Sequence, residues 1–111
     1  MYHPIVEQDL RRMGVGRQYK GSFCVAFATG MYIENNGDHL YITKDVYPVV
    51  AKRMHLKWKA VEQNITYVAR KCWEKNPEYL REIAGYELER QPSNQEFIDI
   101  LVNHVLRAGE G

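Results

Sequence analysis

The strongest constraint on the fold is the spacing of apolar residues between positions 58 and 74. The apolar positions in this segment step by four, three, one and three residues, at Val61, Ile65, Val68, Ala69 and Cys72. These steps place the side chains on one face of an α-helix. The segment therefore predicts an amphipathic helix with its opposite face open to solvent.

The rest of the sequence also favours helices, and no segment shows the alternation of polar and apolar residues that indicates a strand. Start signals are Pro4, Thr43 as a candidate N-cap, the pair Asn76-Pro77, and a capping box over residues 93–96. Pro48 implies either that regular helix begins near it or that the preceding turn is distorted. We expect an all-α fold of about six helices, with helices over residues 4–13, 18–35, 43–54, 58–74, 76–84 and 94–107.

The longest uncharged run, Gly21 to Ile33, is shorter than the roughly 20 apolar residues of a membrane span and predicts a buried central helix. Two cysteines are too few for a disulfide scaffold, and charged residues occupy the place of a signal peptide, so we expect a cytoplasmic protein. At 111 residues the chain is one domain in length. We divide it into an N-terminal helix and connector (1–19), a helix-turn-helix (43–74) and C-terminal helices (76–107).

The helix-turn-helix interpretation rests on two helices, 43–54 and 58–74, separated by a break of about three residues, with the small Ala51 at the point of close packing. The second helix exposes a ridge in which Gln63 suits an adenine edge and Thr66 a thymine methyl group, between Lys59 and Arg70, which suit phosphates. The alternative is that this ridge is simply the solvated face of an amphipathic helix. The candidate DNA-binding residues are Lys59, Glu62, Gln63, Thr66, Tyr67, Arg70, Lys44, Lys52, Arg53, Lys57 and Lys71.

Charge is distributed unevenly along the chain. Residues 1–75 carry 12 Lys or Arg against 7 Asp or Glu, whereas residues 76–111 carry 3 against 7. A basic front part is a weak indication of a polyanionic partner such as duplex DNA.

No pattern indicates catalysis or a cofactor. The two cysteines and four histidines match no zinc-ligand spacing, and buried cysteine is the expected role of Cys24 and Cys72. A Cys–His nucleophilic pair lacks a third residue to orient it. We therefore expect neither an enzyme nor a metal site.

From Lys20 onward the chain resembles a known family across about four-fifths of its length. The matching pieces occur in order: Lys20-Gly21, Ile42-Thr43-Lys44, Tyr47-Pro48, Ala51-Lys52, Val61-Glu62, Ile65, Trp73, Gly85-Tyr86, Pro92, Asn94, Glu96-Phe97-Ile98 and Leu106-Arg107. They resemble the C-terminal effector domain of stage zero sporulation protein A, a sporulation response regulator. The resemblance implies a six-helix DNA-binding effector with 58–74 as its recognition helix. It also implies tandem binding of two copies, and contact of about residues 74–85 with the sigma subunit of RNA polymerase.

The sequence departs from the family's pattern at the expected recognition helix. The family carries arginines where this chain has Gln63 and Thr66, and a histidine at Tyr67, while Glu62 is retained. The family's receiver domain also does not occur in this sequence. Two hypotheses follow: a transcription regulator that reads DNA with an altered preference, or a protein-interaction module that keeps the fold and has lost base reading.

Overall fold

The computed structural model describes residues 3–110, and within that range every regular element is helical. The all-α expectation is confirmed. The elements are α1 (Pro4–Arg12), α2 (Gly21–Glu34), the π-helical turn η1 (Ile42–Val46), α3 (Tyr47–Met54), α4 (Trp58–Lys75), α5 (Pro77–Ala84) and α6 (Asn94–Glu110).

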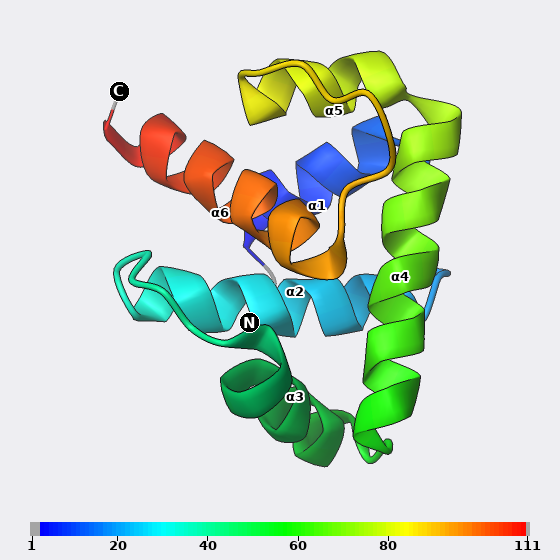
Figure 1. Ribbon diagram of the computed structural model, residues 1–111, viewed down its shortest axis with the longest axis vertical. Coiled ribbons are helices and arrows are strands. Elements are labelled where there is room, and N and C mark those ends of the chain that lie inside the picture. Colours follow the sequence, from blue (N-terminus) through cyan, green and yellow to red (C-terminus); the bar gives the residue numbers. More distant parts are fainter. Residues whose placement is uncertain (1–2, 111) are drawn as a thin grey trace.

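Helix α2 is the centre of the molecule, as its uncharged sequence predicts. It packs against α1, α3, α4 and α6. Figure 1 shows α4 as the long helix along one side, with α3 near its N-terminal end and α5 beyond its C-terminal end. No helix among residues 3–110 is long and apolar enough to cross a bilayer. The helix-turn-helix thus lies on one flank of a bundle built around α2.

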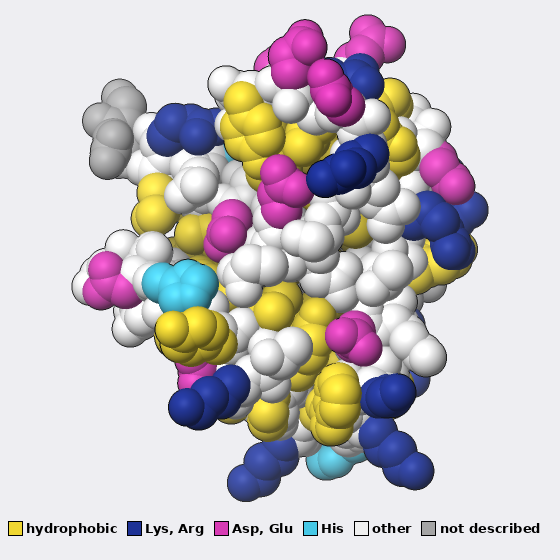
Figure 2. Space-filling model, viewed as in Figure 1, with side chains coloured by type: hydrophobic (Ala, Val, Ile, Leu, Met, Phe, Trp, Pro, Cys, Tyr) yellow, Lys and Arg dark blue, Asp and Glu magenta, His cyan; other side chains and the backbone are white. Residues whose placement is uncertain are grey.

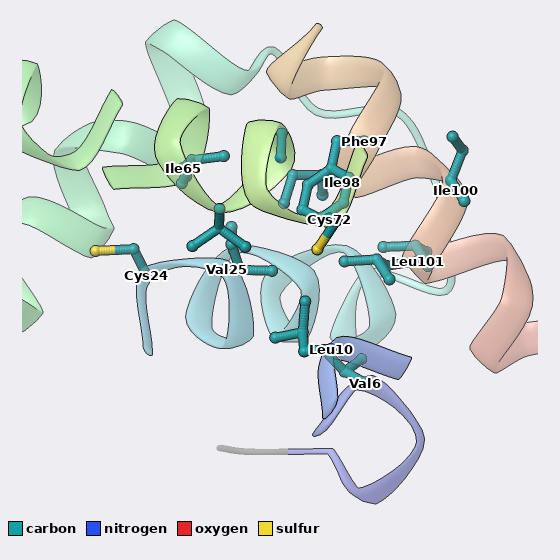
Figure 3. Close-up of a cluster of buried hydrophobic side chains, with 14 of the residues drawn as sticks. Val6, Leu10, Cys24, Val25, Ile65, Cys72, Phe97, Ile98, Ile100 and Leu101 are labelled. Carbon is teal, nitrogen blue, oxygen red and sulfur yellow. The ribbon is translucent and has the colours of Figure 1, made fainter. Parts of the chain in front are cut away.

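The predicted apolar stripe of α4 forms part of one continuous core. Its five residues are 0% exposed, and they meet side chains from α1, α2 and α6. In Figure 3, Leu10 of α1, Val25 of α2, Cys72 of α4 and Leu101 of α6 lie around the same interior. Because the stripe is fully buried, the rotation of α4 about its axis is fixed, and so is the face that it turns outward.

Close approach of α2 and α4 depends on a glycine. A β-carbon at Gly21 would lie 2.7 Å from the backbone oxygen of Asn64 and 2.7 Å from Cγ2 of Val68. Such distances are shorter than atomic contacts allow, so only glycine permits this helix spacing. Gly21 is also the first residue of α2, which starts three residues later than the expected helix over 18–35.

The start of α3 differs from the expected Thr43 cap and shows how the chain accommodates Pro48. Thr43 does not cap this helix; the backbone N–H of Tyr41 instead donates to the Asp45 carboxylate at 2.9 Å, at the start of η1. Pro48 lies in the first turn of α3, where its missing N–H removes no helical hydrogen bond. Both of the alternatives raised by Pro48 therefore hold, since a distorted turn precedes a regular helix that starts beside the proline.

The break between α3 and α4 is closed by a left-handed residue. His55 has φ 58° and ψ 44°, and the N–H of Leu56 donates to the Ala51 carbonyl at 2.9 Å. This is the helix ending in which glycine is usually found. The turn lets α4 start at Trp58, and Ala51 is buried at the packing point as expected.

A buried carboxylate ties the N-terminal helix to the C-terminal half. Asp9 is 1% exposed; it accepts a hydrogen bond from the Tyr79 hydroxyl at 2.6 Å, and its other oxygen lies 2.6 Å from Nδ1 of His104. One side chain of α1 thus connects α5 and α6. Helix α6 extends to Glu110, beyond residue 107, where it was expected to end.

Candidate nucleic-acid interface

The expected recognition helix α4 presents its polar ridge to solvent. Lys59, Gln63, Thr66 and Arg70 are all exposed, on the side opposite the buried stripe. Glu62 and Lys71 are half-buried, and Tyr67 is 36% exposed. The predicted ridge is therefore a continuous exposed polar face of α4.

The ridge borders a groove of about 700 Å³. One wall is α4, another is Ile42 and Thr43 of η1, and the third is residues 91–95 at the start of α6. Five of the predicted residues line it, namely Glu62, Gln63, Thr66, Tyr67 and Arg70. The structure thus collects the predicted base-reading side chains along one concave surface.

A single amide side chain fixes the geometry of this groove. Asn94 of α6 donates from Nδ2 to the Tyr47 hydroxyl at 2.9 Å and to the Glu62 carbonyl at 3.1 Å. Its Oδ1 accepts from the hydroxyl of Thr66 at 3.1 Å, and that hydroxyl also donates to the Glu62 carbonyl at 2.9 Å. Asn94 therefore connects α3, α4 and α6 and holds Thr66 in one orientation.

Two aromatic rings meet between α3 and the start of α4, and of these Tyr47 lines the groove. Tyr47 of α3 and Trp58 of α4 are stacked, with ring centroids 6.5 Å apart and planes inclined by 12°. Burial raises the pKa of Tyr47, although its hydrogen bond with Asn94 acts in the opposite direction, so the phenol is neutral at physiological pH. Trp58 keeps 48% of its surface exposed, and its chain neighbours Lys57 and Lys59 are exposed as well.

The remaining predicted cations surround the ridge unevenly. Lys44 in η1, Lys52 in α3 and Lys57 in the turn are exposed near the N-terminal end of α4. Arg53 is exposed but lies over the Phe27 ring of α2 at 5.4 Å, and it does not line the groove. Lys71 lies over the Tyr67 ring at 5.5 Å. The structure therefore directs Arg53 toward α2 rather than toward the ridge.

The two ends of this face differ in charge. In Figure 2, Lys and Arg side chains gather at the lower end, over α3 and the turn to α4. Asp and Glu side chains gather at the upper end, over α5 and the loop after it. A polyanion would therefore be attracted to the end where α4 begins.

Sequence reasoning missed the role of the α6 start in the groove. The capping box correctly placed the start of the helix, because Ser93 Oγ accepts from the N–H of Glu96 at 3.1 Å. The Glu96 carboxylate accepts instead from the Tyr86 hydroxyl at 2.6 Å. Asn94 was noted only as part of the capping box and of the family resemblance, and no local signal showed that it contacts residues 28 and 47 positions away.

The two cysteines lie in the interior of the protein. Cys24 and Cys72 are both buried, and burial raises the pKa of each thiol, that of Cys72 to about 12. No group of three or more His, Cys, Asp or Glu side chains suited to a metal occurs among residues 3–110. The buried thiols are protonated at neutral pH and serve as small apolar side chains.

Comparison with known proteins gives one family. The family described as sporulation initiation factor Spo0A C terminal matches residues 6–105, which adds most of α1 to the region of resemblance. No solved structure matches the chain.

Proposed function

The chain belongs to the family of Spo0A C-terminal domains, the DNA-binding effector domains of a sporulation regulator, and from this premise we propose that it binds duplex DNA sequence-specifically as a transcription regulator. Helix α4 enters the major groove. The observation that carries the proposal is the exposed ridge of Lys59, Gln63, Thr66 and Arg70 on a helix whose rotation is fixed by a fully buried stripe.

The ridge divides into base-reading and phosphate-binding positions. We assign Gln63 to an adenine edge, Thr66 to a thymine methyl group and Glu62 to the groove beside them, with Tyr67 at the edge of the ridge. Lys59 and Arg70 bind phosphates at the two ends of the ridge. The flanking phosphate contacts come from Lys44, Lys52, Arg53, Lys57 and Lys71. Of these, Arg53 is the least favourably placed for a phosphate, because its guanidinium lies over the Phe27 ring.

The domain organisation and partners complete the proposal. Residues 1–111 act as one cytoplasmic effector domain without enzymatic activity, in which 1–19, 43–74 and 76–107 are the N-terminal, helix-turn-helix and C-terminal parts. Two copies bind in tandem on DNA, and about residues 74–85, which include α5, contact the sigma subunit of RNA polymerase. The exposed Glu78 and Glu82 of α5 support a contact with a basic protein surface.

Selection of duplexes from a random-sequence pool, across a salt series, tests the function. We expect an enriched motif and an affinity that falls steeply with salt. Gln63→Ala should relax the preference at one base and cost about 1–3 kcal/mol on the best site. Lys59→Ala should weaken all sequences alike and lower the salt slope by about 1.

The competing function is a protein-interaction module with the same fold. The observation that favours it is the uncharged character of Gln63 and Thr66, at positions where the family carries arginine. It predicts no DNA binding even at low salt, and unchanged behaviour of both variants. That result would overturn the proposal of DNA binding.

A further inference from the structure

A pair of tyrosines borders α4 on the side away from α6. Tyr19 belongs to the connector between α1 and α2, and Tyr67 belongs to α4; their ring centroids lie 6.1 Å apart. Successive residues of a helix are turned by about 100°. Thr66 therefore borders the start of α6, whereas Tyr67 borders the connector.

Three cations lie over these two rings. The Arg70 guanidinium and the Lys71 ammonium are 5.2 and 5.5 Å from the centroid of Tyr67. The Lys75 ammonium is 5.9 Å from the centroid of Tyr19, and the Lys75 stem passes so close to Gly14 that a β-carbon there would lie 2.6 Å from Cδ. The rings and the connector thus hold three long side chains in one place.

The cations of this cluster form no ion pair within the part of the protein that the structure describes. Lys20 is exposed and follows Tyr19 in the chain, so it adds a fourth cation beside this pair of rings. Among residues 3–110, no carboxylate lies within 4.0 Å of the charged nitrogens of Lys20, Arg70, Lys71 or Lys75. By contrast, Glu7 pairs with Arg11 at 3.3 Å and with another arginine of the N-terminal region. Cations that are held in place without acidic partners are suited to bind an external anion.

The hydroxyl groups of the tyrosine pair add hydrogen-bond donors. Neither the Tyr19 hydroxyl nor the Tyr67 hydroxyl bonds to another group in the described part of the chain. Tyrosine hydroxyls and lysine ammonium groups are common partners of DNA phosphates. Arg70 also lines the groove beside α4, so the cluster is continuous with the proposed DNA interface.

We propose that Tyr19, Lys20 and Lys75, together with Tyr67 and Lys71, form a second contact surface for the phosphate backbone of duplex DNA, beside the major groove that α4 enters. This inference rests on the proposed DNA binding and assigns to it the connector and the C-terminal end of α4. Because Gln63 and Thr66 are uncharged, these flanking cations supply a large part of the salt-dependent affinity.

The test compares lysine variants with a control of equal charge change. Lys20→Ala, Lys75→Ala and the double variant are titrated against the best duplex and against random duplex over a salt series. We expect each single substitution to lower the salt slope by about 1 and the double substitution by about 2, with equal loss on both duplexes. Arg11→Ala removes the same charge from an exposed side chain on α1, where Glu7 is its partner, and should leave the slope unchanged.

The outcomes separate this inference from the proposed function. If the parent binds duplex DNA and the lysine variants keep its slope, the second surface is wrong and the α4 assignment stands. A loss confined to one base preference, or an equal loss for Arg11→Ala, also overturns it. If the parent binds no duplex at low salt, the proposed function itself fails. If circular dichroism shows that Lys75→Ala is unfolded, Lys75→Gln is used in its place, because it keeps most of the side-chain stem that packs over Gly14.

Discussion

The hydroxyl of Thr66 donates to the side-chain oxygen of Asn94 across a distance of 3.1 Å, although 28 residues separate them. Because the hydroxyl proton is used inside the protein, Thr66 offers its methyl group and an oxygen lone pair to the groove. This favours a contact with a thymine methyl group over hydrogen-bond donation to a base acceptor. Under the proposed DNA binding, the base preference at this position depends in part on a residue outside the helix-turn-helix.

Replacement of Asn94 should change that base preference. Asn94→Ala removes one of the two acceptors of the Thr66 hydroxyl, which keeps the Glu62 carbonyl, and it leaves the buried Tyr47 hydroxyl without its partner. Because Thr66 is then less firmly oriented, we expect a broadened preference at one base, and a stability loss of about 1–3 kcal/mol. Selection from a random duplex pool measures the first effect, and urea unfolding measures the second. Ser93→Ala is the neighbouring control. It removes the cap of α6, which should lower the free energy of unfolding by about 1 kcal/mol and leave the selected motif unchanged.

Substitution of Gly21 should separate α2 from α4. The β-carbon in Gly21→Ala would lie 2.7 Å from the Asn64 carbonyl oxygen, so the helices must move apart, at a cost of about 1–3 kcal/mol. Urea unfolding gives the value. Gly109→Ala is the matched control, because no atom lies within 4 Å of the added carbon and the residue is in helix α6. A Gly21→Ala protein as stable as its parent would contradict the close approach described here.

Replacement of the left-handed His55 by glycine should stabilise the protein. At φ 58° a residue with a β-carbon is strained, so His55→Gly should raise the free energy of unfolding by about 1 kcal/mol. Thermal unfolding checks the sign. Gly85 supplies the reverse experiment: it has φ 79° and open space around it, and Gly85→Ala should lose about 1 kcal/mol through backbone strain alone. Equal stability of His55→Gly and His55→Ala would refute the argument.

Burial of Cys72 should make stability fall at alkaline pH. Its pKa is raised from the ordinary 9.0 to about 12, so the native protein keeps a proton that the unfolded chain releases. The stabilisation is complete below pH 9 and is lost as the pH rises toward 12. Unfolding measured over this range in the parent and in Cys72→Ala isolates the contribution. The thiol should also resist alkylation at pH 8 until urea is added, and rapid native alkylation would show that Cys72 is accessible.

Much of the fold followed from local sequence. The apolar stripe from Val61 to Cys72 predicted α4 and its buried face, and Asn76-Pro77 correctly marked the start of α5, where Asn76 Oδ1 accepts from the N–H of Tyr79 at 3.2 Å. These features depend on residues within one or two helical turns. The cap of α3 was misplaced at Thr43, because a π-helical turn precedes this helix and the Asp45 carboxylate accepts from the backbone at its start.

The candidate site was only partly accessible to the same reasoning. The exposed ridge of α4 was found, since helical spacing determines which residues oppose a buried stripe. The sequence did not predict that Arg53 lies over Phe27, because this contact depends on how closely α3 lies beside α2.

The sequence by itself determined the helices, their buried faces and the ridge, since each reflects the 3.6-residue period and the hydrophobic effect. Only the tertiary structure decided which distant groups meet: Asn94 with Thr66, Tyr19 with Tyr67, and Asp9 with His104. Hydrogen bonds and ring contacts act over a few ångströms, and the angles at which helices pack place their partners within that reach.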